Sequence, residues 1–156
     1  MIRLEIPGWK RLEIAHLVLD HNGTLAGRGL LLPGVGERLE RLAERVEIEV
    51  ATADTFGNAR RQLAGLPLEL IELGPDAQSE AKREIVERLG AGSTAAIGNG
   101  RNDRLMLETA ALGVALLQDE GAAREALLAA DAICRDARDA LDLLLDPRRL
   151  VATLRG

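Results

Sequence analysis

Aromatic residues are almost missing from this sequence, which has one Trp, one Phe and no Tyr among 156 residues. Proteins that bind single-stranded nucleic acid stack bases on aromatic side chains, so this composition argues against that class of function. A formal net charge of -5 also provides no broad positive surface for a polyanion. We therefore expect no nucleic-acid partner, although a local site can still bind a small phosphorylated molecule.

Cysteine and long apolar runs are scarce as well. Cys134 is the single cysteine, so it forms no internal disulfide and is expected to be a buried strand residue. No apolar run approaches the roughly 18 residues that a membrane helix needs. The alternating start, Met1–Ile6 before Pro7-Gly8, lacks the charged segment and apolar core of a signal peptide. These absences predict a cytoplasmic protein without a membrane partner.

Aliphatic residues are abundant: 47% of the chain is hydrophobic, nearly all of it Ala, Leu, Val and Ile. That content is enough for the core of one domain, which we expect to span residues 1–156. Short β-rich runs alternate with helical stretches, the pattern of an α/β fold. We predict a Rossmann-like, doubly wound parallel sheet with helices on both faces. A short N-terminal β-ribbon, from Ile2–Ile6 and Arg11–Ile14, is expected to precede it.

The expected elements follow from the periodicity of the apolar residues. The strands are Leu17–Leu19, Val46–Ala51, Leu68–Leu73, Thr94–Ile97, Gly113–Leu117 and Ala132–Cys134. The helices are Val35–Arg45, Gly57–Leu63, Ser79–Leu89, Asp103–Ala110, Ala122–Ala129 and Asp136–Leu145.

Three of the expected strands end in polar clusters. Open parallel sheets bind ligands beyond the carboxyl ends of their strands, so these clusters locate the chemistry. They are Asp20-His21-Asn22-Gly23-Thr24, Thr52-Ala53-Asp54 and Gly98-Asn99-Gly100-Arg101-Asn102-Asp103.

The first cluster resembles the D-x-D-G-T signature of haloacid-dehalogenase-like enzymes, and more closely the D-K-T-G-T of P-type ATPases. In the same order along the chain, Thr52-Ala53-Asp54 resembles T-G-D, Lys82 matches the single lysine, and residues 98–103 resemble G-D-G-x-N-D. The chain is similar to soluble proteins that look like the phosphorylation domain of a P-type ATPase. The resemblance implies a capless haloacid-dehalogenase-like phosphatase.

The resemblance also implies a role for each matching residue. Asp20 is the nucleophile that becomes an aspartyl-phosphate, and Thr52 and Lys82 hold the phosphoryl oxygens. His21, Gly23 and Ala53 lie in the loops around that phosphoryl group.

A magnesium site is implied as well, because Mg²⁺ prefers a few oxygen ligands. Its ligands would be Asp20, the backbone carbonyl of Asn22, Asn99 and Asp103. The set of hard oxygen atoms argues against zinc.

Each of these residues also has a purely structural interpretation. Asn22-Gly23 is a common β-turn dipeptide, Thr52 and Asp54 can cap a helix, and Asp103 suits the first turn of a helix. Lys82 alone would be a solvated helix residue, yet the chain has 18 Arg and only two Lys. The two histidines have no partner at metal-ligand spacing: His16 is expected in a strand, and His21 faces the substrate or has a structural role.

Two residues depart from the family pattern. Phosphatases of the family carry an acid-base Asp where this chain has Asn22, and a metal-binding Asp where it has Asn99. An amide cannot transfer the proton, and general acid-base help is commonly worth about 10²–10⁴-fold. We therefore expect slow hydrolysis and weakened Mg²⁺ binding.

The spacing of the motifs leaves no room for an inserted cap domain. Only 31 residues separate Asp20 from Thr52, and 29 separate Thr52 from Lys82. The open site would accept a small phosphorylated molecule or a phosphorylated macromolecule, or be closed by a neighbouring subunit of a homo-oligomer.

The leading hypothesis from the sequence is thus a Mg²⁺-dependent phosphohydrolase or phosphotransferase that acts through Asp20. The alternative, motivated by Asn22 and Asn99, is a regulatory or scaffold relative that binds Mg²⁺ and phosphate with little or no turnover. An ATPase subunit is disfavoured because no separate nucleotide-binding domain fits in 156 residues.

Overall fold

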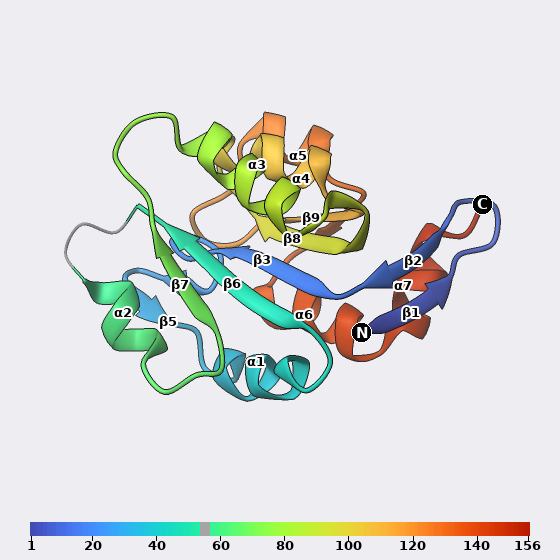
Figure 1. Ribbon diagram of the computed structural model, residues 1–156, viewed down its shortest axis with the longest axis horizontal. Coiled ribbons are helices and arrows are strands. Elements are labelled where there is room, and N and C mark those ends of the chain that lie inside the picture. Colours follow the sequence, from blue (N-terminus) through green and yellow to red (C-terminus); the bar gives the residue numbers. More distant parts are fainter. Residues whose placement is uncertain (54–56) are drawn as a thin grey trace.

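The computed structural model describes residues 1–53 and 57–156, and in this part of the chain six parallel strands form the central sheet. Their order across the sheet is β10-β9-β8-β3-β6-β7. All the other strands of this sheet follow β3 in the sequence, with β6 and β7 on one side of it and β8, β9 and β10 on the other. Figure 1 shows β3 in the middle of the molecule, with β6 and β7 on one side and β8 and β9 on the other. The strands are β3 (His16–Asp20), β6 (Glu47–Thr52), β7 (Glu69–Glu72), β8 (Thr94–Gly98), β9 (Leu112–Leu116) and β10 (Ala132–Cys134).

Helices cover both faces of this sheet, as the sequence predicted. Two helices, α1 (Val35–Ala43) and α6 (Ala137–Leu145), pack together on one face. Three others lie on the opposite face, above the sheet in Figure 1: α3 (Gln78–Leu89), α4 (Arg104–Thr109) and α5 (Arg124–Ala129). The shorter α2 (Asn58–Leu63) adds its buried side chains to the α1 face.

The strand periodicity explains why both faces are apolar. Successive side chains of a strand point to opposite faces, so Leu17 and Leu19 of β3 join the cluster under α1 and α6. Val18 joins the second cluster, under α3 and α4. A strand buried on both faces needs a continuous apolar run, which is what residues 17–19 provide.

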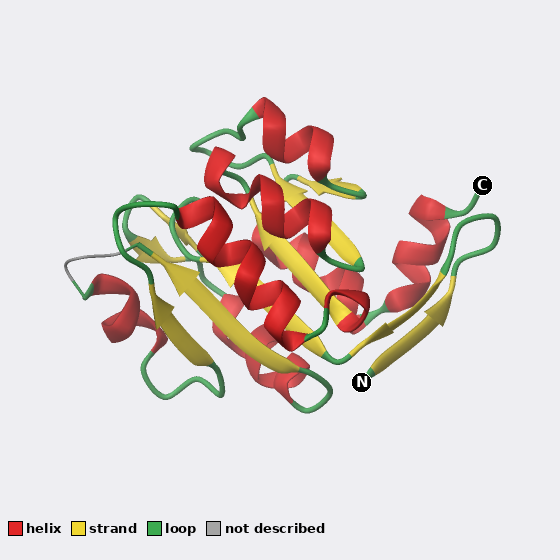
Figure 2. Cartoon of the chain, turned by 45° about the horizontal axis from the view of Figure 1, so that its top comes forward, coloured by secondary structure: helices red, strands yellow, loops and turns green. Residues whose placement is uncertain are grey.

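The N-terminal ribbon is present as a separate two-stranded antiparallel sheet. Its strands are β1 (Ile2–Glu5) and β2 (Arg11–Ile14), with Ile2 paired to Ile14. Figures 1 and 2 show that it extends from the sheet beside the last helix, α7 (Pro147–Leu154). The C-terminus meets the turn of the ribbon, because the amide of Gly156 donates to the carbonyl of Pro7 at 3.1 Å.

Most differences from the predicted elements are shifts of one or two residues at the ends. The sequence analysis missed α7 and a small hairpin of β4 (Ala26–Gly27) and β5 (Leu30–Leu31), whose strands are too short to show a period. Cys134 lies in a strand as expected, but it is only partly buried because β10 is the edge of the sheet. None of the helices in the described ranges is long and apolar enough to cross a membrane.

Candidate active site

The predicted site residues meet where three neighbouring strands end. Asp20 is the last residue of β3, Thr52 the last of β6 and Gly98 the last of β8. The strands are parallel and in register, with Asp20 opposite Ala51 and Leu19 opposite Ile97. After β3 the chain adds β6 and β7 on one side of it and then β8, β9 and β10 on the other side. Ligands of such sheets bind at the strand where this direction of addition reverses.

The centre of the site is a buried cluster of one ammonium and two carboxylates. Lys82, on α3, donates from Nζ to Oδ1 of Asp20 at 2.6 Å and to Oδ1 of Asp103 at 2.7 Å. The exposed fractions of the side chains are 1% for Lys82, 0% for Asp103 and 10% for Asp20. The fully ionised cluster carries one net negative charge, and Asp20 is its member with access to solvent.

Burial and neighbouring charges shift the protonation of these groups. Burial and the carboxylate of Asp103 raise the pKa of Asp20 to about 7, although Lys82 and the backbone amide of His21 lower it. Burial by itself lowers the pKa of Lys82, but the two carboxylates outweigh burial and raise that pKa. Lys82 therefore stays protonated at neutral pH. Any further positive charge beside Asp20 would stabilise the ionised form of its carboxyl group.

A tight turn follows Asp20 and brings polar groups back to it. The amide of Thr24 donates to the carbonyl of His21, and Gly23 takes a left-handed conformation with φ of +74°. The Thr24 hydroxyl lies 3.3 Å from Oδ2 of Asp20 and 3.4 Å from Oδ1 of Asn99. The turn thereby joins the end of β3 to the loop after β8.

The second carboxylate, Asp103, is held firmly by the loop that precedes it. Its Oδ2 accepts hydrogen bonds from the amides of Asn99 at 2.9 Å and Gly100 at 2.8 Å. A β-carbon at Gly98 would lie 2.5 Å from Cγ of Asp103, so only glycine permits this approach. Asp103 is thus oriented by two amides and presents its other oxygen to Lys82.

Two amide side chains join the surrounding loops. Asn99 Nδ2 donates to the carbonyl of Gly121 at 3.1 Å. Gln118 Nε2 donates to the carbonyls of Gly23 and Thr24, both at 2.9 Å, and its Oε1 accepts from the amide of Ala137. Sequence reasoning missed Gln118, although it closely follows β9 and so obeys the rule that located Asp20.

The other predicted site residues lie around the cluster. Thr52 is buried and comes one residue beyond the partner of Asp20, and Ala53 follows it. His21 is buried, with Nδ1 3.2 Å from Oδ1 of Asn22, while Asn22 itself is exposed. Asp54 of the second motif lies outside the described residues.

The remaining histidine and lysine lie away from this site. His16 begins β3, at the opposite end from Asp20, and its Nδ1 is 3.2 Å from Glu47. Lys10 lies in the ribbon turn, over the ring of Trp9.

A polar groove of about 590 Å³ opens between the start of α3 and the loop before α4. Asn102 Nδ2 donates to Oε1 of Gln78 across it, at 2.8 Å. Its lining includes Gln78, Ser79, Arg101, Asn102 and Arg104. The same helix carries Lys82 and the same loop carries Asp103, although neither buried side chain lines the groove.

Protein acids alone do not make a metal site in the described residues. No three His, Cys, Asp or Glu side chains gather closely enough there to hold an ion. The oxygens near Asp20 are instead those of an amide, a hydroxyl and backbone carbonyls. Such neutral oxygen donors suit a hard cation better than zinc.

Comparison with solved structures bears on the fold. The chain superimposes on 3-deoxy-D-manno-octulosonate 8-phosphate phosphatase from Moraxella catarrhalis, which was solved with a magnesium ion, a phosphate ion and a KDO molecule. The TM-score is 0.72 and the identity 17%, and the match covers 91% of this chain and 94% of that one. A Vibrio cholerae structure described as the same phosphatase gives a TM-score of 0.73, 18% identity and coverage of 96% and 97%. The cobalt-bound enzyme from Haemophilus influenzae gives 0.72, 18% identity and coverage of 92% and 94%. The chain therefore has the fold of the haloacid-dehalogenase-like superfamily.

Sequence comparison adds two archaeal relatives. No protein-family profile matches the chain. It is 52% identical over 60 residues to an uncharacterized protein of Methanocaldococcus jannaschii, a match that covers 38% of this chain and 64% of that protein. A second uncharacterized protein of the same organism is 51% identical over 39 residues, covering 25% of this chain and 89% of that protein. The chain belongs to the same family as this second relative.

Proposed function

We propose that this protein is a Mg²⁺-dependent phosphohydrolase or phosphotransferase that forms an aspartyl-phosphate on Asp20. The observation that carries the proposal is the contact of Asp20 with Lys82 at 2.6 Å, at the strand end where the order of the sheet reverses. Asp20 is the member of the buried cluster that retains solvent access, so a phosphate ester can reach it. The fold, shared with phosphatases solved with magnesium and cobalt, supports the same activity.

Asp20, Lys82 and Thr52 would take separate roles in the transfer. An Asp20 oxygen attacks phosphorus and forms the new P–O bond while the bond to the leaving oxygen breaks. Lys82 neutralises the transferring phosphoryl group, and Thr52 donates its hydroxyl to the same oxygens. The loop residues His21, Gly23 and Ala53 surround that group, where backbone amides after a strand can hold it.

The donor set near Asp20 fits Mg²⁺. An oxygen of Asp20, the Asn22 carbonyl and Oδ1 of Asn99 would hold the ion, which shields the charge of phosphate when bound. Direct ligation by Asp103, expected from the sequence, stays a prediction. Its oxygens already accept from Lys82 and two amides, which favours a role in positioning Lys82.

The second half of the reaction should be slow. Hydrolysis of the aspartyl-phosphate requires a group that takes a proton from water, and the exposed Asn22 side chain cannot do so. The phosphorylated form would therefore persist, which suits transfer to another acceptor as well as hydrolysis.

The lining of the groove supports a proposal on the substrate class. A leaving group that lies beside Arg101 and Asn102 can form hydrogen bonds with their side chains. We therefore propose a polar, phosphorylated small molecule or a phosphorylated macromolecule as the substrate. A neighbouring subunit of a homo-oligomer would be an alternative way to cover the site.

A second candidate function rests on the two amides at Asn22 and Asn99. A regulatory or scaffold protein that binds Mg²⁺ and phosphate needs no proton transfer, so neither amide would be a defect. The two candidates differ in turnover alone.

A labelling experiment tests the proposal. The protein is incubated with Mg²⁺ and acetyl phosphate, and intact-mass spectrometry measures the gain of one phosphoryl group; a panel of phosphate esters then measures turnover. We expect the label on wild-type protein and none on Asp20→Asn. Absence of both label and turnover would reject the enzyme and favour the binding protein.

A further inference from the structure

The exposed Glu120 lies beside the site although no family motif includes it. A β-carbon at Gly23 would be 2.8 Å from Oε2 of Glu120, and 2.7 Å and 3.0 Å from Nδ2 and Oδ1 of Asn99. The carboxylate of Glu120 and the amide of Asn99 therefore flank the same point of the turn after Asp20. Among the described residues, Glu120 forms no hydrogen bond or ion pair, so its carboxylate is free to take a ligand.

The loop that carries Glu120 is held in place from three sides. Gln118 donates to the carbonyls of Gly23 and Thr24, and Asn99 Nδ2 donates to the carbonyl of Gly121. The amide of Ala123 donates to the carbonyl of Asn99 at 2.9 Å. These hydrogen bonds fix the backbone of the loop that places Glu120 over the turn.

The hydrogen bond from Asn99 explains why an amide suits this position. An ionised aspartate has no proton to donate to the Gly121 carbonyl, so it could not hold this loop as Asn99 does. With an amide at position 99, the site has one carboxylate ligand fewer. The same amide holds the loop that brings the carboxylate of Glu120 close.

We propose, on the basis of the proposed function, that Glu120 supplies the carboxylate that Asn99 lacks, as part of the divalent-cation site at Asp20. Mg²⁺ keeps several of its water molecules when proteins bind it. Glu120 accepts hydrogen bonds from those waters, while Asp20, Asn99 and the Asn22 carbonyl contact the ion itself. Loss of such an outer partner typically lowers metal affinity by about 10–100-fold.

Calorimetric titration with Mg²⁺ alone, without substrate, tests this role. We expect Glu120→Gln to weaken binding by about 10-fold, at the low end because Glu120 is exposed. The matched control is Asp119→Asn, which removes the same charge from the neighbouring residue; Asp119 lies 3.8 Å from Arg28 and outside the Gly23 contact. We expect this control to change affinity by less than about two-fold, since exposed charges are well screened.

Two further measurements separate the outcomes. The melting temperature of Glu120→Gln with a chelator should equal that of the wild type, which excludes a folding defect. Equal Mg²⁺ affinity in wild type and Glu120→Gln, with loss of binding in Asp20→Asn, would overturn this inference and leave the proposed function intact. Absence of Mg²⁺ binding by the wild-type protein would overturn both.

Discussion

Helix α3 makes two ion pairs with the central sheet, and they differ in kind. Near its start, Lys82 lies between Asp20 and Asp103 with all three side chains buried. At its end, Arg88 Nη2 lies 2.6 Å from Oε2 of Glu49 on β6; the Arg88 side chain is 55% exposed and that of Glu49 is 7% exposed. The contacts are equally short, so distance does not distinguish them.

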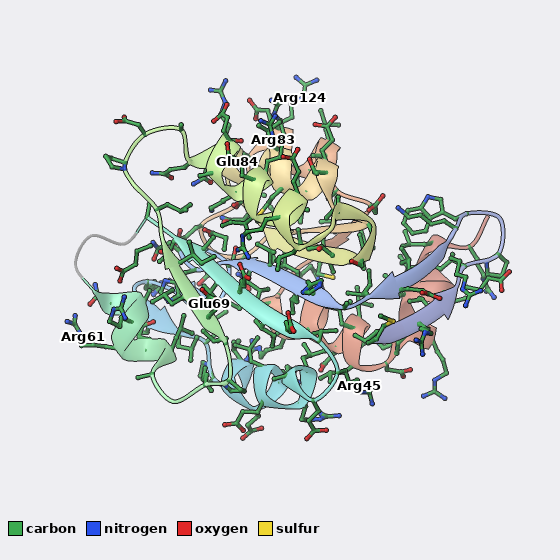
Figure 3. All side chains as sticks on the ribbon, viewed as in Figure 1. Arg45, Arg61, Glu69, Arg83, Glu84 and Arg124 are labelled. Atoms are coloured by element: carbon green, nitrogen blue, oxygen red, sulfur yellow. The ribbon has the colours of Figure 1, made fainter. Side chains whose placement is uncertain are left out.

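The charge balance does distinguish them. The Arg88 pair is neutral, and its guanidinium reaches water, as do the labelled surface residues such as Arg83 and Arg124 in Figure 3. The Lys82 cluster holds two carboxylates for one ammonium, away from water. A neutral pair is complete and stabilises the fold, whereas a buried excess of negative charge is costly unless a cation compensates it. Lys82, near the start of α3, therefore belongs to the site, whereas Arg88, at its end, stabilises the fold.

Removing each cation should separate the two pairs most strongly. Lys82→Met leaves two buried carboxylates without a partner, so we expect a loss of about 3–5 kcal/mol in the free energy of unfolding. Arg88→Met leaves one buried carboxylate, that of Glu49, without its partner, and the expected loss is about 1–2 kcal/mol. Urea denaturation of both variants measures the difference. Equal losses would show that burial does not set the two pairs apart.

Trapping the phosphorylated state should affect only the first pair. Beryllium fluoride with Mg²⁺ mimics an aspartyl-phosphate, and a ligand at 100 times its Kd stabilises a protein by about 2.7 kcal/mol. We expect this rise in thermal stability in wild type and in Arg88→Met, and its loss in Asp20→Ala. A response of Asp20→Ala equal to wild type would contradict the assignment of Asp20.

The same contrast shows what the sequence could predict. Asp20 and Asp103 were found because residues at the ends of parallel strands converge, a rule that needs only the order of the elements. Lys82 lies in a helix and was found because it resembles the single lysine of the family pattern and is one of only two lysines in the chain. Glu49, by contrast, alternates with Ile48 and Val50 in an apolar strand, and nothing in the sequence pairs it with an arginine 39 positions later.

Some of the site and fold depended on contacts that the pattern does not contain. The roles of Gln118 and Glu120 depend on how a loop after β9 folds over the Gly23 turn, which is a contact about 95 residues apart in sequence for Gln118. Helix α7 was missed because it is short and its stability depends on packing against the ribbon.

Restoring the missing acid should change chemistry at the first pair and leave the second untouched. Asn22→Asp provides a group able to protonate the leaving oxygen and then deprotonate water, so we expect phosphate-ester turnover to rise about 10-fold. The side chain is exposed, so the fold should tolerate the charge. The lifetime of radiolabelled phospho-Asp20 in a chase experiment should shorten by a similar factor. Unchanged turnover and lifetime would mean that residue 22 is not at the acid-base position.

Neutralising one carboxylate in each pair should give changes of opposite sign. Glu49→Gln removes the partner of Arg88, so we expect a loss of about 1 kcal/mol in unfolding free energy. Asp20→Asn leaves Lys82 and Asp103 as a neutral pair and should raise stability by about 1 kcal/mol when a chelator removes divalent cations.

The pH dependence identifies the cause: the pKa of Asp20 is raised from 3.8 to about 7, chiefly by burial and then by Asp103. The folded state therefore holds the proton more tightly than the unfolded state, and ionisation of Asp20 costs stability as the pH rises from about 4 to about 7. The gain from Asp20→Asn should accordingly be larger at pH 8 than at pH 5, which denaturation curves at the two pH values measure. A gain that is the same at both would assign the effect to packing, and a loss of stability at pH 8 would show that Asp20 is a structural partner of Lys82, as Glu49 is of Arg88.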